Sequence, residues 1–141
     1  MFMFCGKKIL IIDGNANYLY ALEAKLVVSG AEVLTHTGTG KLIEITKILQ
    51  TEKVDSVILE LDLPDFDGQK VLYEMRNEPR TSSLPVFIYT FTDDEKKRKA
   101  LDILGAPYYF NKGEIGQDEF IGKIHKILIN KEKLKNLKSK N

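Results

Sequence analysis

The chain has one cysteine, two histidines and no apolar run long enough to cross a membrane. The single Cys5 excludes an internal disulfide framework and favours a reducing compartment, so we expect a cytoplasmic protein. His36 and His125 are isolated from each other and from Cys5, which gives no spacing for a zinc site. The apolar residues 1–4 are too short for a secretion signal and lack its positive start. We therefore predict no membrane association.

The remaining composition is that of one soluble globular domain, with 141 residues, 43% apolar and 29% charged. The net charge of +1 conceals an asymmetry, because residues 131–141 contain five lysines and only one glutamate. A basic tail can contact nucleic acid. Without arginine or aromatic residues, however, it is more typical of a solvated helix end or a linker, and we do not expect nucleic-acid binding.

Short apolar runs of strand type alternate with amphipathic segments along the chain. Strands are expected at residues 7–13, 31–36, 57–61, 85–90 and 108–112, with a helix after each. Turn chemistry after the first strand offers an Asn as a helix cap, and Asp67-Gly68 signals a further helix start. Thr92 and Glu95 have capping-box spacing. The alternation predicts an α/β fold, doubly wound, with a parallel sheet covered by helices on both faces.

This reading places one domain at residues 7–130, preceded by an N-terminal extension at residues 1–6. Residues 131–141 are interpreted as a basic C-terminal tail or the start of a linker. Its leucines, Leu134 and Leu137, also allow the last helix to continue through this segment.

A polar side chain stands at the end of four of the predicted strands: Asp13, Glu60, Thr90 and Lys112. Parallel strands end at one edge of their sheet, where open α/β folds bind ligands, so these side chains should converge. Carboxylate oxygens suit Mg²⁺, and a hydroxyl with an ammonium suits phosphoryl oxygens. The alternative is that four unrelated polar residues end these strands.

The motifs around these strand ends resemble the receiver domain of two-component response regulators, from about residue 7 to residue 129. They are Ile11-Ile12-Asp13-Gly14, Glu60-Leu61-Asp62-Leu63-Pro64, Asp67-Gly68, Thr90-Phe91 and Tyr109-Phe110-Asn111-Lys112-Gly113. The resemblance implies a (βα)5 flavodoxin-like three-layer sandwich with a five-stranded parallel sheet in the order 2-1-3-4-5. It also implies a role in phosphorelay signal transduction, without enzymatic activity of its own.

The resemblance also assigns roles to residues. Glu60 occupies the phosphoacceptor position, and Lys112 would contact the phosphoryl group. Thr90 and Tyr109 match the family's switch pair, although Tyr109 could instead simply pack with its aromatic neighbours Tyr108 and Tyr89. The resemblance also implies that any magnesium site would be weak and would be formed by Asp13, Glu60 and Asp62.

Four positions depart from the family pattern. Glu60 replaces an aspartate, and Gly14 replaces a second acid that would help to hold the metal. Phe91 replaces a small residue and is expected to fill the phosphoryl pocket. Gly113 replaces a proline, where a cis peptide bond would cost several kcal/mol. We therefore expect Mg²⁺ binding to be weakened or absent, and phosphotransfer to be absent or very slow.

Two functions follow. The first is an atypical, phosphorylation-independent pseudo-receiver that acts through protein–protein interaction. The second is a working phosphoacceptor, modified at Glu60 or a neighbouring acid by a histidine kinase. Asp62 is disfavoured as that acceptor because its position and direction differ. An FMN carrier is disfavoured because the loop after the first strand lacks the hydroxyls that would cradle phosphate.

The resemblance places the partner-docking surface on the fourth helix, fifth strand and fifth helix, at residues 93–104, 108–111 and 118–130. Residues 96–99 give this surface four consecutive positive charges. Such a run would suit an acidic signalling protein, although it is also typical of a solvated helix face. A homodimer is compatible with the resemblance.

Overall fold

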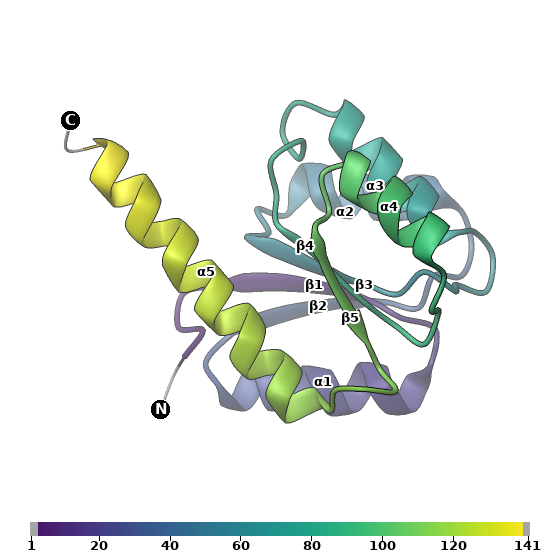
Figure 1. Ribbon diagram of the computed structural model, residues 1–141, viewed down its shortest axis with the longest axis horizontal. Helices are drawn as coiled ribbons and strands as arrows, with labels where there is room; N and C mark the ends of the chain where they lie inside the picture. The colour runs from purple at the N-terminus through teal and green to yellow at the C-terminus, as the bar shows by residue number, and fades with distance from the viewer. Residues whose placement is uncertain (1–2, 140–141) are drawn as a thin grey trace.

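Five parallel strands form one sheet in the order β2-β1-β3-β4-β5 (Figure 1). The computed structural model describes residues 3–139. The strands are Lys8–Ile12 (β1), Glu32–His36 (β2), Ser56–Leu59 (β3), Val86–Thr90 (β4) and Tyr108–Asn111 (β5). The helices are Ala16–Val28 (α1), Leu42–Thr51 (α2), Gly68–Asn77 (α3), Glu95–Ile103 (α4) and Gln117–Ser139 (α5). The predicted α/β fold and strand order are confirmed.

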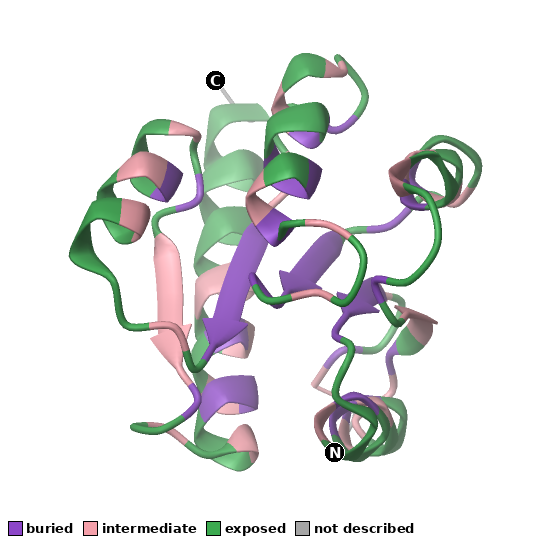
Figure 2. Ribbon diagram, turned by 90° about the vertical axis from the view of Figure 1, so that its right-hand side faces the viewer, coloured by how far each residue is buried: buried purple, intermediate pink, exposed green. Residues whose placement is uncertain are grey.

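Two apolar layers enclose the sheet. β1, β3 and β4 are almost fully buried, whereas the outer strands β2 and β5 are mostly half-buried (Figure 2). On one face, Ile45 of α2, Leu72 of α3 and Leu101 of α4 pack against the sheet. On the other face, Leu22 of α1 and Phe120 of α5 do the same. This arrangement directs all five strands toward one carboxyl edge.

Two of the predicted helix starts are found. The Asn15 side chain accepts hydrogen bonds from the first amides of α1. The Asp67 carboxylate accepts one from Gln69 at the start of α3. Gly68 is required there, because an added Cβ would lie 2.3 Å from the carbonyl oxygen of Glu60. The start of α3 can therefore approach the backbone of Glu60 directly.

The capping box predicted for Thr92 and Glu95 is wrong. α4 begins at Glu95 itself, and the Asp94 carboxylate accepts hydrogen bonds from the amides of its first turn. The Thr92 hydroxyl donates instead to the carboxylate of Asp62 at 3.0 Å. A short acid directly before the helix reaches those amides more easily than a threonine that is held elsewhere.

The two ends of the described chain differ. At the N-terminal end, Phe4 is 1% exposed, belongs to the core beside α1 and α5, and donates its amide to the Ser29 carbonyl at 2.9 Å. At the other end, α5 continues to Ser139, and its residues from Asn130 onward are exposed. The last two residues of the predicted tail lie outside the described residues. Among the helices at residues 3–139, none has both the length and the apolar character needed to span a bilayer.

Candidate functional site

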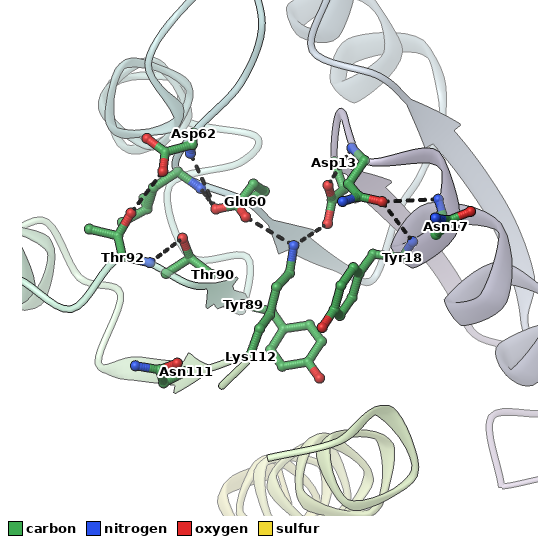
Figure 3. A network of polar contacts seen from close by, with 12 residues as sticks. Asp13, Asn17, Tyr18, Glu60, Asp62, Tyr89, Thr90, Thr92, Asn111 and Lys112 are labelled. Atoms are coloured by element: carbon green, nitrogen blue, oxygen red, sulfur yellow. Dashed lines mark hydrogen bonds and ion pairs between the residues drawn. The ribbon is translucent and has the colours of Figure 1, made fainter. Parts of the chain in front are cut away.

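Four polar side chains lie at the carboxyl edge of the sheet. Asp13 and Glu60 directly follow the ends of β1 and β3, Thr90 ends β4, and Lys112 follows β5. All four residues are buried. Figure 3 shows them gathered in one network, as the positions of the strand ends predict.

Lys112 joins the two carboxylates. Its Nζ donates to Oδ2 of Asp13 at 2.7 Å and to Oε1 of Glu60 at 2.9 Å. The exposed fraction of the side chain is 1% for Lys112 and 8% for each acid. Buried charges are costly unless they are paired and hydrogen-bonded. The three charges, which we call the ion bridge, satisfy this condition while leaving one excess negative charge.

Backbone amides stabilise that excess charge. Oδ1 of Asp13 accepts from the Asn15 amide at 2.8 Å. Oε2 of Glu60 accepts from the amides of Leu61 and Asp62 at 2.5 and 3.2 Å. The extra methylene of Glu60, relative to aspartate, lets its carboxylate turn back onto its own backbone while it still meets Lys112. Both oxygens of Glu60 are therefore engaged.

Aromatic rings surround the remaining side of the ammonium. The ring centroids of Tyr18, Phe91 and Tyr89 lie 4.3, 5.7 and 5.8 Å from Lys112 Nζ. Such cation–π contacts contribute roughly 0.5–2 kcal/mol each. Sequence reasoning missed Tyr18, although its place in the first turn of α1, close behind Asp13, brings it to the same edge.

Phe91 does not fill the predicted phosphoryl pocket. The residue is 55% exposed, and its ring meets that of Tyr18 edge-on, with 5.5 Å between the centroids. The space between Glu60 and Lys112 is taken by their direct bond instead. The expectation for Phe91 was therefore wrong. The peptide bond from Lys112 to Gly113 is trans.

Thr92 connects three parts of the site. Its amide donates to the Thr90 hydroxyl at 3.2 Å, and its own hydroxyl donates to Oδ2 of Asp62 at 3.0 Å. Its carbonyl accepts from the Tyr109 hydroxyl. The carboxylate of Asp62 consequently points toward Thr92 and away from Lys112 (Figure 3). The loops after β3 and β4 are held together at this residue.

Tyr109 packs on the sheet face that carries α2, α3 and α4, whereas Tyr108 and Tyr89 pack on the opposite face. The alternative that Tyr109 simply packs with those two aromatic residues is therefore wrong. The Arg98 guanidinium lies 5.1 Å from its ring centroid. Burial, and to a smaller extent the charge of Asp93, raises the pKa of the Tyr109 hydroxyl above its ordinary value.

The three carboxylates predicted as metal ligands do not meet at one point. Asp13 and Glu60 share Lys112, while Asp62 bonds to Thr92. Within residues 3–139, no group of three or more His, Cys, Asp or Glu side chains is placed to hold a metal ion. At position 14, an added Cβ would lie 2.7 Å from Cδ of Pro64. As arranged, these residues do not fit a magnesium shell.

The strand order, the buried acid after β3 and the lysine after β5 define a receiver-type domain. The sequence matches the response regulator receiver domain family over residues 9–125. The chain belongs to this family, whose members act in two-component signal transduction with histidine kinases and typically bind Mg²⁺.

Curated relatives cover this chain to different extents. The transcriptional regulatory protein KdpE of Mycobacterium tuberculosis is 36% identical over 118 residues, which cover 82% of this chain and 48% of KdpE. Protein PilH of Pseudomonas aeruginosa is 29% identical over 106 residues, which cover 71% of this chain and 85% of PilH. The chain thus spans about half the length of KdpE and most of PilH.

Solved structures agree with the fold. A CheY-like receiver domain protein from Methanospirillum hungatei has a TM-score of 0.79 at 21% identity. The matched region covers 90% of this chain and 97% of the Methanospirillum chain. The Mn²⁺-bound form of the response regulator Rcp1 has a TM-score of 0.69 at 23% identity. The matched region covers 84% of this chain and 88% of the Rcp1 chain. At these identities, the likeness shows the fold alone.

Proposed function

We propose that this receiver domain signals through protein–protein contacts without cycling a phosphoryl group, and that it is not an enzyme. The observation that carries the proposal is the ion bridge, in which Lys112 already bonds to Asp13 and Glu60. A phosphoryl group on Glu60 would carry about −1.5 to −2 charge in place of the single carboxylate charge, and would therefore add roughly −0.5 to −1. It would enter a buried cluster that already has one excess negative charge, which is electrostatically unfavourable.

The position of Glu60 supports the same conclusion. Its longer side chain displaces the nucleophilic oxygen, and a displacement of about 1 Å can cost on the order of 10²-fold in rate. One oxygen bonds to Lys112 and the other to backbone amides. Phosphorylation would have to break part of this arrangement first.

The metal would be held weakly or not at all. Asp62 is engaged by Thr92, and Gly14 supplies no carboxylate. Magnesium binding would require Lys112 to release at least one acid, because an ammonium and a dication compete for the same oxygens. Rcp1, by contrast, has been solved with Mn²⁺.

In place of phosphorylation, the ion bridge partly imitates a charged, switched-on site. Partners would dock on the surface of α4, β5 and α5, where an open groove of about 470 Å³ lies between α4 and β5. Arg98, Lys99 and Tyr109 line this groove together with the acids Asp93, Glu95 and Asp102. Its charge is therefore mixed, and the exposed Lys96 adds positive charge to α4. Such a module would act in the cytoplasm within a phosphorelay that contains a histidine kinase.

Incubation with acetyl phosphate and Mg²⁺, followed by intact mass measurement, tests the proposal. We expect no adduct. A hydroxylamine-labile gain of about 80 Da, the mass of a phosphoryl group, would overturn it. That result would favour the alternative, a working phosphoacceptor: loss of the adduct in Glu60→Gln would point to Glu60, and its persistence would point to a neighbouring acid.

A second set of variants identifies which departure disables the site. Glu60→Asp alone tests side-chain length. Gly14→Asp cannot be tested alone, because its Cβ would collide with the Pro64 ring. The informative combination is Glu60→Asp with Gly14→Asp and Pro64→Ala. An adduct in this triple variant but not in the wild type would show that these positions suffice to block phosphotransfer.

A further inference from the structure

The last part of α5 extends beyond the sheet (Figure 1) and is exposed along its whole length (Figure 2). Leu134 and Leu137 are 60% and 61% exposed there. The base of this segment is held to the body by Ile127 and Leu128, which pack against the core, and Glu132 pairs there with Lys7 at 2.5 Å. Two large apolar side chains thus stand on an anchored helix with nothing in the described chain covering them.

These leucines continue a regular pattern that starts within the body. The pattern consists of Ile127, Asn130, Leu134 and Leu137, spaced by three, four and three residues. This is the spacing of core positions in a helix that packs against another helix. We call these four residues the α5 seam. Ile127 is half-buried against the core of the body, whereas the two leucines are exposed, so the seam begins inside the body and only its outer part is open to a partner.

Lysine occupies every position that flanks the α5 seam. On one side are Lys126 and Lys133, and on the other are Lys131 and Lys138. Flanking positions of this kind face the partner helix and decide which partner is accepted. In a parallel pair of copies, Lys133 would face Lys138 of the second copy. In an antiparallel pair, lysines would again face lysines. Like charges therefore disfavour a second copy of this chain as the occupant.

A lipid surface fits less well. Helices that lie on membranes present a wide apolar face that usually carries large aromatic or leucine side chains. The exposed part of the seam has two leucines and no aromatic residue. A narrow apolar stripe between two rows of lysines instead complements a narrow apolar stripe between two rows of acids.

We infer that the α5 seam binds an acidic amphipathic helix of a partner protein. This inference rests on the proposed docking function and specifies its partner. The surface is continuous with the one proposed above, because Lys131 Nζ lies 5.6 Å from the ring centroid of Tyr108 in β5. The partner helix would follow α5 outward from this edge strand, with its apolar side chains on Leu134 and Leu137 and its acids opposite the lysines.

A labelled model peptide tests the inference on the full chain. The peptide has three heptads, with leucine at both core positions, glutamate at both flanking positions and glutamine elsewhere. A matched peptide carries lysine in place of glutamate. By fluorescence anisotropy, we expect the acidic peptide to bind at least about tenfold more tightly than the basic one. We also expect its binding to weaken as salt is raised, because exposed charges are screened.

Variants of the chain distinguish the contribution of the leucines to peptide binding from that of the lysines. Leu134→Ala combined with Leu137→Ala should weaken acidic-peptide binding by at least about tenfold, since each leucine loses apolar contact. Val28→Ala is the matched control, because Val28 is 77% exposed but lies on α1, and it should change nothing. Lys133→Glu combined with Lys138→Glu should move the preference toward the basic peptide.

Several outcomes would overturn the inference. These are equal binding of the two peptides, binding of neither, or self-association of the chain that depends on Leu134 and Leu137 in sedimentation. Binding to phosphatidylserine vesicles that depends on the same leucines, without peptide binding, would assign the seam to membranes instead. The result is separable from the phosphodonor test, because peptide binding at α5 is read out without any modification of Glu60.

Discussion

The ion bridge and the α5 seam are two charged regions with opposite designs. In the ion bridge, each charged group is buried and paired inside the protein. In the seam, lysines on both flanks face solvent beside exposed leucines. The charged groups of the ion bridge are therefore bonded to one another within the fold. The exposed lysines and leucines of the seam remain free to contact another molecule. The proposed function assigns recognition to the second region rather than to chemistry at the strand ends.

The largest effect should come from Lys112→Met, which leaves two buried carboxylates without their cation. Breaking a buried pair by removing one partner costs about 3–5 kcal/mol. Urea unfolding should show a loss of this size in the free energy of unfolding. The matched control is Lys25→Met, which removes an exposed pair with Asp118 and should cost less than about 1 kcal/mol. Equal losses in the two variants would remove the contrast between buried and exposed charge.

Tyr89→Phe should have the next largest effect, about 1–2 kcal/mol, because the Tyr89 hydroxyl donates to the Ile115 carbonyl at 2.8 Å. Burial, followed by the charges of Tyr18 and Asp13, raises the pKa of Tyr89 from 10.0 to about 12. The unfolded chain releases this proton first, so the corresponding stability is complete below pH 10 and is lost as the pH rises toward 12. The stability difference between wild type and Tyr89→Phe should therefore shrink over this range, as unfolding curves at each pH will show.

Thr92→Val should cost about 0.5–1 kcal/mol, because it removes only the hydroxyl bond to the exposed Asp62. The amide and carbonyl of Thr92 keep their partners. Hydrogen exchange should quicken at the loop after β4 and leave β4 itself protected. Unchanged exchange in that loop would contradict the role of Thr92 in joining the two loops.

The smallest effect is expected from Lys133→Gln combined with Lys138→Gln, which alters two exposed lysines of the seam flanks. Surface substitutions of this kind usually change stability by less than about 0.5 kcal/mol. The thermal midpoint should stay close to that of the wild type. A loss comparable to that of Lys112→Met would mean that the seam contributes to folding rather than to recognition.

The fold could be predicted because its signals are local. The apolar runs of β1, β3 and β4 are nearly continuous, as buried parallel strands require, and the four polar residues stand directly at strand ends. In a parallel sheet with β1 beside β3 and β5 close by, Asp13, Glu60 and Lys112 reach the same part of the carboxyl edge. Their convergence therefore depends on strand direction, which the alternation of strands and helices predicts, and on strand order, which the family resemblance implies.

Three local features could not be predicted because they depend on contacts between residues that are distant in the sequence. The start of α4 depends on which acceptor meets its first amides, and Thr92 was excluded by its bonds to Asp62 and Tyr109. Phe4 lies in a segment predicted as an extension, yet it fills space between α1 and α5 that no local pattern reveals. Phe91 was expected inside the pocket because a substitution shows which side chain is present, but not where its ring will point.

Cys5 offers a practical consequence of its position. It is the only thiol of the chain, it is exposed, and it lies two residues before Lys7, which holds Glu132 of α5. A maleimide dye would attach there alone, without any engineered cysteine. Because the dye would sit beside the base of the projecting helix, its emission could follow capture of a partner in real time on the native sequence.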